Sequence, residues 1–124
     1  MALKILAVDD SKMIRMLIKK TFKPFNCDIV EAENGVEGLA AALREKPDII
    51  ILDVNMPVMK GDEMLTKLRN EHGIKDIPVI MLTAEAVKDH ISHITDMGVT
   101  DYILKPFKGE QLIESAKKAI KLEA

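Results

Sequence analysis

Residues 48–57 read D-I-I-I-L-D-V-N-M-P. Four consecutive apolar residues, three of them isoleucines, lead directly into Asp53, and a short apolar run bounded by polar residues and proline is typical of a strand buried on both faces. Asp53 therefore ends a buried strand, where an unpaired carboxylate loses its hydration. Two interpretations stay open: Asp53 belongs to a site that uses its charge, or it caps a helix, although Pro57 delays that helix.

The length and composition bound the class of protein. The 124 residues predict one domain, residues 1–124, with a core that needs no disulfide. The 18 basic and 20 acidic residues give a net charge of −2, without a basic stripe carrying aromatic residues, so we expect no direct nucleic-acid binding. The single Cys27 suits a reducing compartment, and no apolar run has membrane-spanning length. We expect a cytoplasmic monomer without membrane insertion.

Apolar runs and helical periodicity predict alternating strands and helices. Five strands are expected, at residues 3–8, 28–32, 49–52, 77–82 and 101–104. Ser11 is expected to cap the first helix. Apolar residues at helical spacing mark five helices, whose marker sets are Ile14, Leu17, Ile18 and Phe25; Val36, Leu39, Ala40 and Leu43; Met64, Leu65 and Leu68; Val87, Ile91 and Ile94; and Leu112, Ile113, Ala116 and Ile120.

The strand order follows from the apolar character of each run. Residues 3–8, 49–52 and 77–82 are the most continuously apolar and are placed in the middle of the sheet, with the other two runs at its edges. With right-handed crossovers this favours the order 2-1-3-4-5. The expected fold class is α/β: a doubly wound, five-stranded parallel sheet of the flavodoxin-like type, with five helices on two faces.

Polar residues follow the predicted strands at their carboxyl ends. Ligands of such sheets bind outside these ends, where the winding direction switches, here between the first and third strands. Asp9 and Asp10 end the first strand, Asp53 the third, Thr83 the fourth and Lys105 the fifth. We therefore expect all five side chains on one rim of the sheet.

Three carboxylates on one rim repel one another, and a hard divalent cation with oxygen ligands relieves that repulsion. Mg²⁺ is the expected ion, with Mn²⁺ as an alternative, because Mg²⁺ is bound by one or two carboxylates together with phosphate oxygens. A carboxylate can also accept a phosphoryl group. The ammonium of Lys105 and the hydroxyl of Thr83 are then suited to meet the phosphoryl oxygens.

Four motifs resemble the receiver domain of two-component response regulators, over essentially the whole chain: D-D at 9–10, D-x-N-M-P at 53–57, T-A at 83–84 and K-P-F at 105–107. The resemblance implies that Asp53 is the phosphoacceptor of a histidine kinase. It implies that Asp10 and Asp53 ligate the metal directly, Asp9 through water, and Asn55 through its backbone carbonyl. It also implies a regulatory protein that catalyses only its own phosphorylation and dephosphorylation.

The same resemblance assigns the switch. Lys105 would contact the phosphoryl group, Thr83 would be the switch hydroxyl, and Tyr102 would be the aromatic residue that swings inward when Thr83 moves. The Lys105–Pro106 peptide bond is cis in this family. The face formed by the fourth helix, fifth strand and fifth helix would bind the output partner.

Three further residues resemble those of the stand-alone, CheY-type receivers of chemotaxis. Asn55, two residues after Asp53, and Glu85, two residues after Thr83, resemble the pair associated with a short-lived phosphate. The small side chain of Ala84 leaves the acceptor accessible. The chain stops with its fifth helix, so output is expected through a partner such as a flagellar switch component, with a phosphatase as a further candidate partner.

Other functions make different demands on the same residues. A phosphorelay intermediate that passes phosphate to a histidine phosphotransferase stays open. A small Mg-dependent aspartyl-phosphate hydrolase of the dehalogenase-like class would need D-x-D on the first strand, and a flavodoxin would need a phosphate loop where Asp9 and Asp10 stand. His90 and His93 share a helical face but lack a third ligand, so they are expected on the surface.

Three local expectations concern packing. Arg15 is expected with Lys19, Lys20 and Lys23 on a solvated helix face. Gly38 in the second helix is expected to cost about 1 kcal/mol relative to alanine and to affect no functional residue. The eight methionines are expected mostly in the core.

Overall fold

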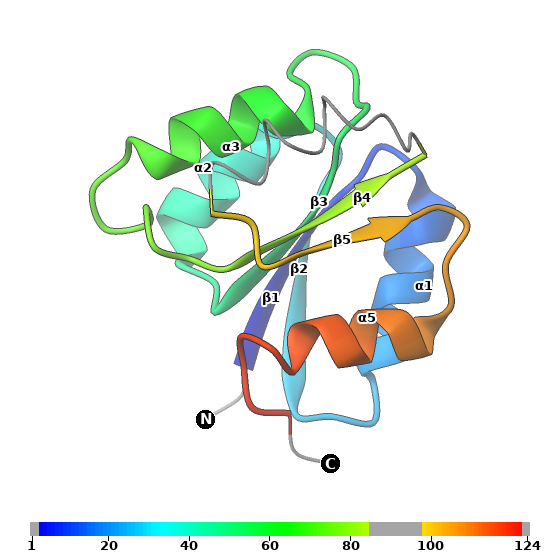
Figure 1. The fold of residues 1–124 in the computed structure, drawn as a ribbon. Coiled ribbons are helices and arrows are strands. Elements are labelled where there is room, and N and C mark those ends of the chain that lie inside the picture. Colours follow the sequence, from blue (N-terminus) through cyan, green and yellow to red (C-terminus); the bar gives the residue numbers. More distant parts are fainter. Residues whose placement is uncertain (1–2, 85–97, 123–124) are drawn as a thin grey trace.

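The computed structural model describes residues 3–84 and 98–122. The expected fourth helix, together with Glu85, His90 and His93, lies outside the described residues. The elements follow in the order β1 (Leu3–Val8), α1 (Lys12–Phe22), β2 (Cys27–Ala32), α2 (Gly35–Glu45), β3 (Ile49–Asp53), α3 (Gly61–Arg69), β4 (Val79–Thr83), β5 (Asp101–Leu104) and α5 (Gly109–Ala116) (Figure 1).

The strands form one parallel sheet in the order β2-β1-β3-β4-β5, which confirms the predicted topology. Every residue of β3 and β4 is buried, whereas the edge strands β2 and β5 are partly exposed. A central parallel strand is covered by helices on both faces, which is why the Ile49–Leu52 run contains no polar residue.

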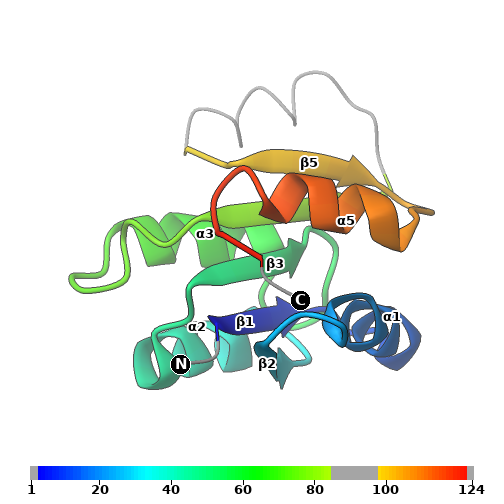
Figure 2. The ribbon, with the colours of Figure 1, turned by 90° about the horizontal axis from the view of Figure 1, so that it is seen from below.

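The helices cover the two faces of the sheet in pairs. α1 and α5 pack together on one face, and α2 and α3 pack together on the other (Figures 1 and 2). Successive residues of a strand point to opposite faces. Ile49 and Ile51 accordingly enter the core under α1 and α5, while Ile50 and Leu52 enter the core under α2 and α3.

The first and last described helices end earlier than their apolar patterns. The Ser11 hydroxyl accepts a hydrogen bond from the Ile14 N–H at 3.3 Å, which confirms the expected cap of α1. α1 stops at Phe22, and Phe25 packs back from the following turn, with a ring-centroid distance of 6.5 Å to Phe22. α5 stops at Ala116, so Ile120 packs against the core from beyond the helix.

The role of Gly38 differs from the expectation that it only lowers helix propensity. A Cβ atom at this position would lie 2.8 Å from Met64 Sδ and 2.9 Å from Val8 Cγ1. The glycine therefore lets α2 approach β1 and α3 closely, and its role is packing rather than a mere loss of helix propensity. Since Val8 immediately precedes Asp9, Gly38 also packs directly under the strand end that leads into the polar rim.

Arg15 gives a further correction, whereas most methionines of the described residues lie in the core as expected. Arg15 is only 6% exposed, because it lies with Ile18 and Phe22 on the stripe of α1 that faces the sheet. Met56, Met64 and Met81 are buried as expected. Two others, Met13 and Met16, are exposed on α1.

Among the helices of residues 3–84 and 98–122, none combines the length and apolar character needed to cross a bilayer.

Candidate functional site

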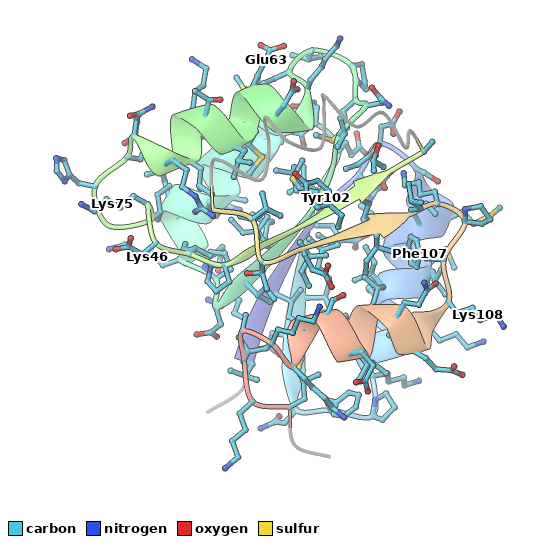
Figure 3. All side chains as sticks on the ribbon, viewed as in Figure 1. Lys46, Glu63, Lys75, Tyr102, Phe107 and Lys108 are labelled. Carbon is cyan, nitrogen blue, oxygen red and sulfur yellow. The ribbon has the colours of Figure 1, made fainter. Side chains whose placement is uncertain are left out.

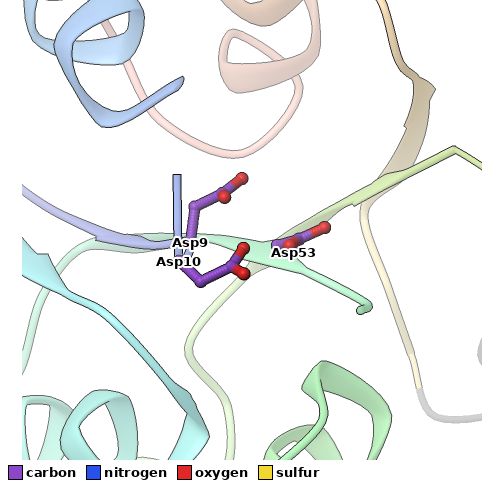
Figure 4. Close-up of side chains that lie close together, drawn as sticks. All are labelled: Asp9, Asp10 and Asp53. Carbon is purple, nitrogen blue, oxygen red and sulfur yellow. The ribbon is translucent and has the colours of Figure 1, made fainter. Parts of the chain in front are cut away.

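Asp9, Asp10 and Asp53 form an acidic cluster at the carboxyl ends of β1 and β3 (Figure 4). One carboxylate oxygen from each residue lies within 4.8 Å of the others. Val8 pairs with Leu52 across the parallel strands, so the residues that follow them, Asp9 and Asp53, emerge side by side. Asp9 and Asp53 are buried, whereas Asp10 is exposed and leaves the cluster open to solvent.

Lys105 joins this cluster from the other half of the sheet. Its Nζ atom donates hydrogen bonds to Asp9 Oδ2 and to Asp53 Oδ1, each at 3.0 Å. The Lys105 N–H donates to the Thr83 carbonyl at 2.8 Å, which ties the chain after β5 to the end of β4. Burial would lower the pKa of Lys105, but the hydrogen bonds and charges of the two carboxylates raise it above its usual value.

The charged form of Asp53 is less stable than the charged form of an ordinary, solvent-exposed aspartate. Burial is the main cause and the Asp9 charge the next, and together they outweigh the hydrogen bond from Lys105, raising the pKa of Asp53 from 3.8 to about 6. One ammonium therefore does not compensate the three carboxylates. The excess negative charge is the kind of environment that a hard divalent cation stabilises.

Asp9 is oriented by its own turn. Its Oδ1 atom accepts a hydrogen bond from the Ser11 N–H at 2.9 Å, and its N–H donates to the Ala32 carbonyl at 3.1 Å. With Oδ2 bonded to Lys105, both carboxylate oxygens of Asp9 are engaged inside the protein. Asp10 and Asp53 consequently present the more available oxygens of the cluster.

Thr83 lies buried at the end of β4, on the same rim as the cluster. Ala84, which follows it, is exposed, as is Asn55 in the loop after β3. Tyr102 lies on β5 opposite Met81 and packs, half-buried, against the core beneath α2 and α3 (Figure 3). The peptide bond between Lys105 and Pro106 is cis. Glu85 lies outside the described part of the chain.

Gly61 is a site residue that sequence reasoning missed. A Cβ atom there would lie 2.0 Å from the Asp53 carbonyl oxygen, and the Gly61 N–H donates to the Val54 carbonyl at 2.9 Å. α3 therefore begins directly against the backbone of the strand end that carries Asp53. Its position shortly after Pro57, before an apolar helical pattern, was the available signal.

Arg15 is the second residue that was missed. Its guanidinium donates to the carbonyl oxygen of Asp9 and to Glu31 Oε1. The available signal was its spacing of three and seven residues from Ile18 and Phe22, which places it on the buried stripe of α1.

Comparisons with known proteins identify the family of this chain. The model of the response regulator receiver domain family matches residues 5–117. The chain is 38% identical over 120 residues to the chemotaxis protein CheY homolog of Campylobacter jejuni, covering 95% of this chain and 92% of that protein. It is 37% identical over 121 residues to the sensor histidine kinase CheAY of Helicobacter pylori, covering 96% of this chain and only 15% of that protein.

Solved structures show the same similarity. The chemotaxis response regulator CheY4 of Vibrio cholerae superposes with a TM-score of 0.89 and 35% identity, covering 97% of this chain and all of that one. Fold, strand-end residues and sequence similarity therefore agree. The chain belongs to the receiver domain family of response regulators, with CheY chemotaxis proteins among its relatives.

Proposed function

We propose that this chain is a phospho-accepting signalling switch of a two-component system in chemotaxis, with Asp53 as the phosphoacceptor. The observation that carries the proposal is the contact of one partly buried ammonium, Lys105 Nζ, with two buried carboxylates at 3.0 Å each. An aspartate that only capped a helix would not need this arrangement. Family membership and the CheY relatives support the same conclusion.

The donor set fits Mg²⁺, and Mn²⁺ by the same chemistry, because it consists of carboxylate oxygens from two strand ends within 4.8 Å of one another. Asp10 and Asp53 would ligate the ion directly, Asp9 through water, and Asn55 through its backbone carbonyl. When bound, the ion supplies positive charge for the phosphoryl oxygens.

The chain's own residues supply the rest of the chemistry. With a pKa of about 6, the Asp53 carboxylate is ionised at neutral pH and can act as a nucleophile. An Asp53 oxygen forms the new P–O bond while the P–N bond to the kinase phosphohistidine breaks, and the donor imidazole leaves. Lys105, already 3.0 Å from Asp53 Oδ1, is placed to offset the charge on the transferred group.

The chain thus acts as a regulatory protein, and its catalysis concerns only its own phosphorylation and dephosphorylation. The exposed position of Ala84 leaves room for water or a phosphatase near the acceptor. The phosphodonor is a histidine kinase, consistent with a relative in which such a sequence is part of a sensor histidine kinase. The output partner is a flagellar switch component, consistent with relatives named chemotaxis proteins.

The switch couples Thr83 to Tyr102. A phosphoryl group on Asp53 draws the Thr83 hydroxyl toward itself, and the Tyr102 ring fills the space that opens. Tyr102 is already half-buried on β5, one strand from β4. The partner then binds the face that includes β5 and α5 with altered affinity, by a coupling of about 1 to 3 kcal/mol.

Phosphorylation with a small donor tests the proposal. The protein is incubated with acetyl phosphate and Mg²⁺, and incorporation is measured for the parent, Asp53→Asn and Asp28→Asn. Asp28 is the matched control. It is an exposed carboxylate near the amino ends of the strands, where it lies opposite Lys4 in the strand register. We expect labelling of the parent and of Asp28→Asn, abolished by Asp53→Asn or by a chelator. Equal labelling of all three proteins would refute the assignment.

A phosphotransfer assay distinguishes a switch that binds an output partner from a phosphorelay intermediate. We expect the phosphorylated protein to bind a flagellar switch component more tightly than the unmodified protein does. Rapid loss of its phosphate to a histidine phosphotransferase, without such binding, would instead establish a phosphorelay intermediate.

A further inference from the structure

Arg15 is a buried cation next to the acidic cluster, and the phosphorylation chemistry above makes no use of it. Its guanidinium donates to the Asp9 carbonyl oxygen and to Glu31 Oε1, the latter at 3.1 Å, and lies 3.7 Å from Glu33 Oε1. A planar guanidinium presents several donors in one rigid plane, so it can serve such partners at once. Arg15 thereby connects α1, the end of β2 and the turn that follows β1.

The carbonyl that Arg15 contacts has a particular place in the site. It belongs to the peptide group that joins Asp9 to Asp10, and a peptide group is planar. Fixing the direction of this carbonyl therefore fixes the plane from which Asp10 departs. Asp10 itself is exposed, so the burial that orients Asp9 and Asp53 does not act on it.

We propose that Arg15 is a positioning residue for the divalent-cation site, acting through the Asp9–Asp10 peptide group. This inference rests on the proposed function and deepens it. Arg15 holds the peptide group so that the Asp10 carboxylate stays within reach of Asp53. Residues that orient metal ligands in this way typically change metal affinity by about 10- to 100-fold when they are replaced.

The charge of Arg15, if it acted alone, would predict the opposite change in Mg²⁺ affinity. Arg15 is a positive charge beside a cation site, so its removal should tighten Mg²⁺ binding if charge were its only effect. Positioning predicts weaker binding, because the loss of the guanidinium frees the Asp9–Asp10 peptide group to turn. The direction of the change in affinity therefore distinguishes the two effects.

Lys19 provides a matched control. It lies on the same helix, carries the same charge, and contacts the other oxygen of Glu31, with Nζ to Oε2 at 3.4 Å. Lys19 is exposed, and its bond to Glu31 leads away from Asp9. Lys19→Met thus removes a cation from Glu31 while the contact between Arg15 and the Asp9 carbonyl stays in place.

The experiment is a calorimetric titration of Mg²⁺ into the parent, Arg15→Met, Arg15→Lys and Lys19→Met, at one ionic strength, with circular dichroism to check folding. We expect Arg15→Met to bind Mg²⁺ about tenfold more weakly than the parent. The Mg²⁺ affinity of Arg15→Lys should fall between those of the parent and Arg15→Met, because an ammonium lacks the planar, forked donors of a guanidinium. Lys19→Met should bind as tightly as the parent or slightly more tightly.

Two results would overturn the inference. Folded Arg15→Met that binds Mg²⁺ as tightly as the parent, or more tightly, would show that Arg15 does not position the site. If Arg15→Met does not fold, Arg15→Lys decides, because it keeps the charge and loses the planar fork: weaker Mg²⁺ binding supports the inference, and unchanged affinity refutes it. Failure of the parent to bind Mg²⁺ would refute the proposed function itself, which separates the two failures.

Discussion

In the absence of metal, replacing the phosphoacceptor is expected to stabilise the fold at neutral pH. The pKa of Asp53 is raised from 3.8 to about 6, chiefly by burial. This rise of about 2 units corresponds to about 3 kcal/mol, at 1.36 kcal/mol per unit. The Asp53 side chain is only 5% exposed, so solvent screens this cost little. Asp53→Asn keeps the shape of the side chain and removes the charge.

The direction of this change in stability follows from the linkage between proton binding and folding. Below the unfolded pKa of 3.8, both folded and unfolded parent protein hold Asp53 protonated, and the group contributes no difference. As the pH rises through about 6, the folded state must carry a charge that it holds less favourably than the unfolded chain does. The parent therefore loses stability over this range relative to Asp53→Asn, by up to about 3 kcal/mol.

Urea unfolding in the presence of a chelator checks the prediction, with Asp28→Asn as the control for loss of an exposed carboxylate. We expect the advantage of Asp53→Asn to be below about 1 kcal/mol at pH 4 and to grow to about 3 kcal/mol at pH 8. Mg²⁺ should then stabilise the parent and narrow the gap. A variant no more stable than the parent at pH 8, or a difference independent of pH, would refute the reasoning.

Three further predictions concern the metal, the core and the switch. Asp10→Asn should weaken Mg²⁺ binding about tenfold or more, because a direct ligand is lost; unchanged affinity, like that expected of Asp28→Asn, would remove Asp10 from the ligand set. Gly38→Ala should destabilise the fold by about 1 to 3 kcal/mol in urea unfolding despite better helix propensity, because its Cβ overlaps packed side chains; a gain in stability would contradict this. Thr83→Ala should keep labelling at Asp53 but lose most of the phosphorylation-dependent change in fluorescence of Tyr102, the single tyrosine in a chain without tryptophan; a full change would exclude the coupling.

Much of the fold and the rim could be predicted because the signals are local. The uninterrupted run Ile49–Leu52 identifies a strand buried on both faces, since only such a strand excludes polar residues from both sides. In a parallel sheet all carboxyl ends lie at one edge, so the residues after each strand necessarily share that edge. Asp9, Asp53 and Lys105 could therefore be assigned to one site before their distances were known.

The remaining features depend on which segments meet in three dimensions. Arg15 is buried because β2 brings Glu31 to it and the turn after β1 brings the Asp9 carbonyl. Gly38 is required because Val8 and Met64, distant in the sequence, approach it closely. The pKa of Asp53 likewise follows from burial and from charges on two other segments, residues 9–10 and Lys105. Periodicity reports which face of an element is apolar, but contacts across elements arise from packing, and packing fixed these three residues' roles.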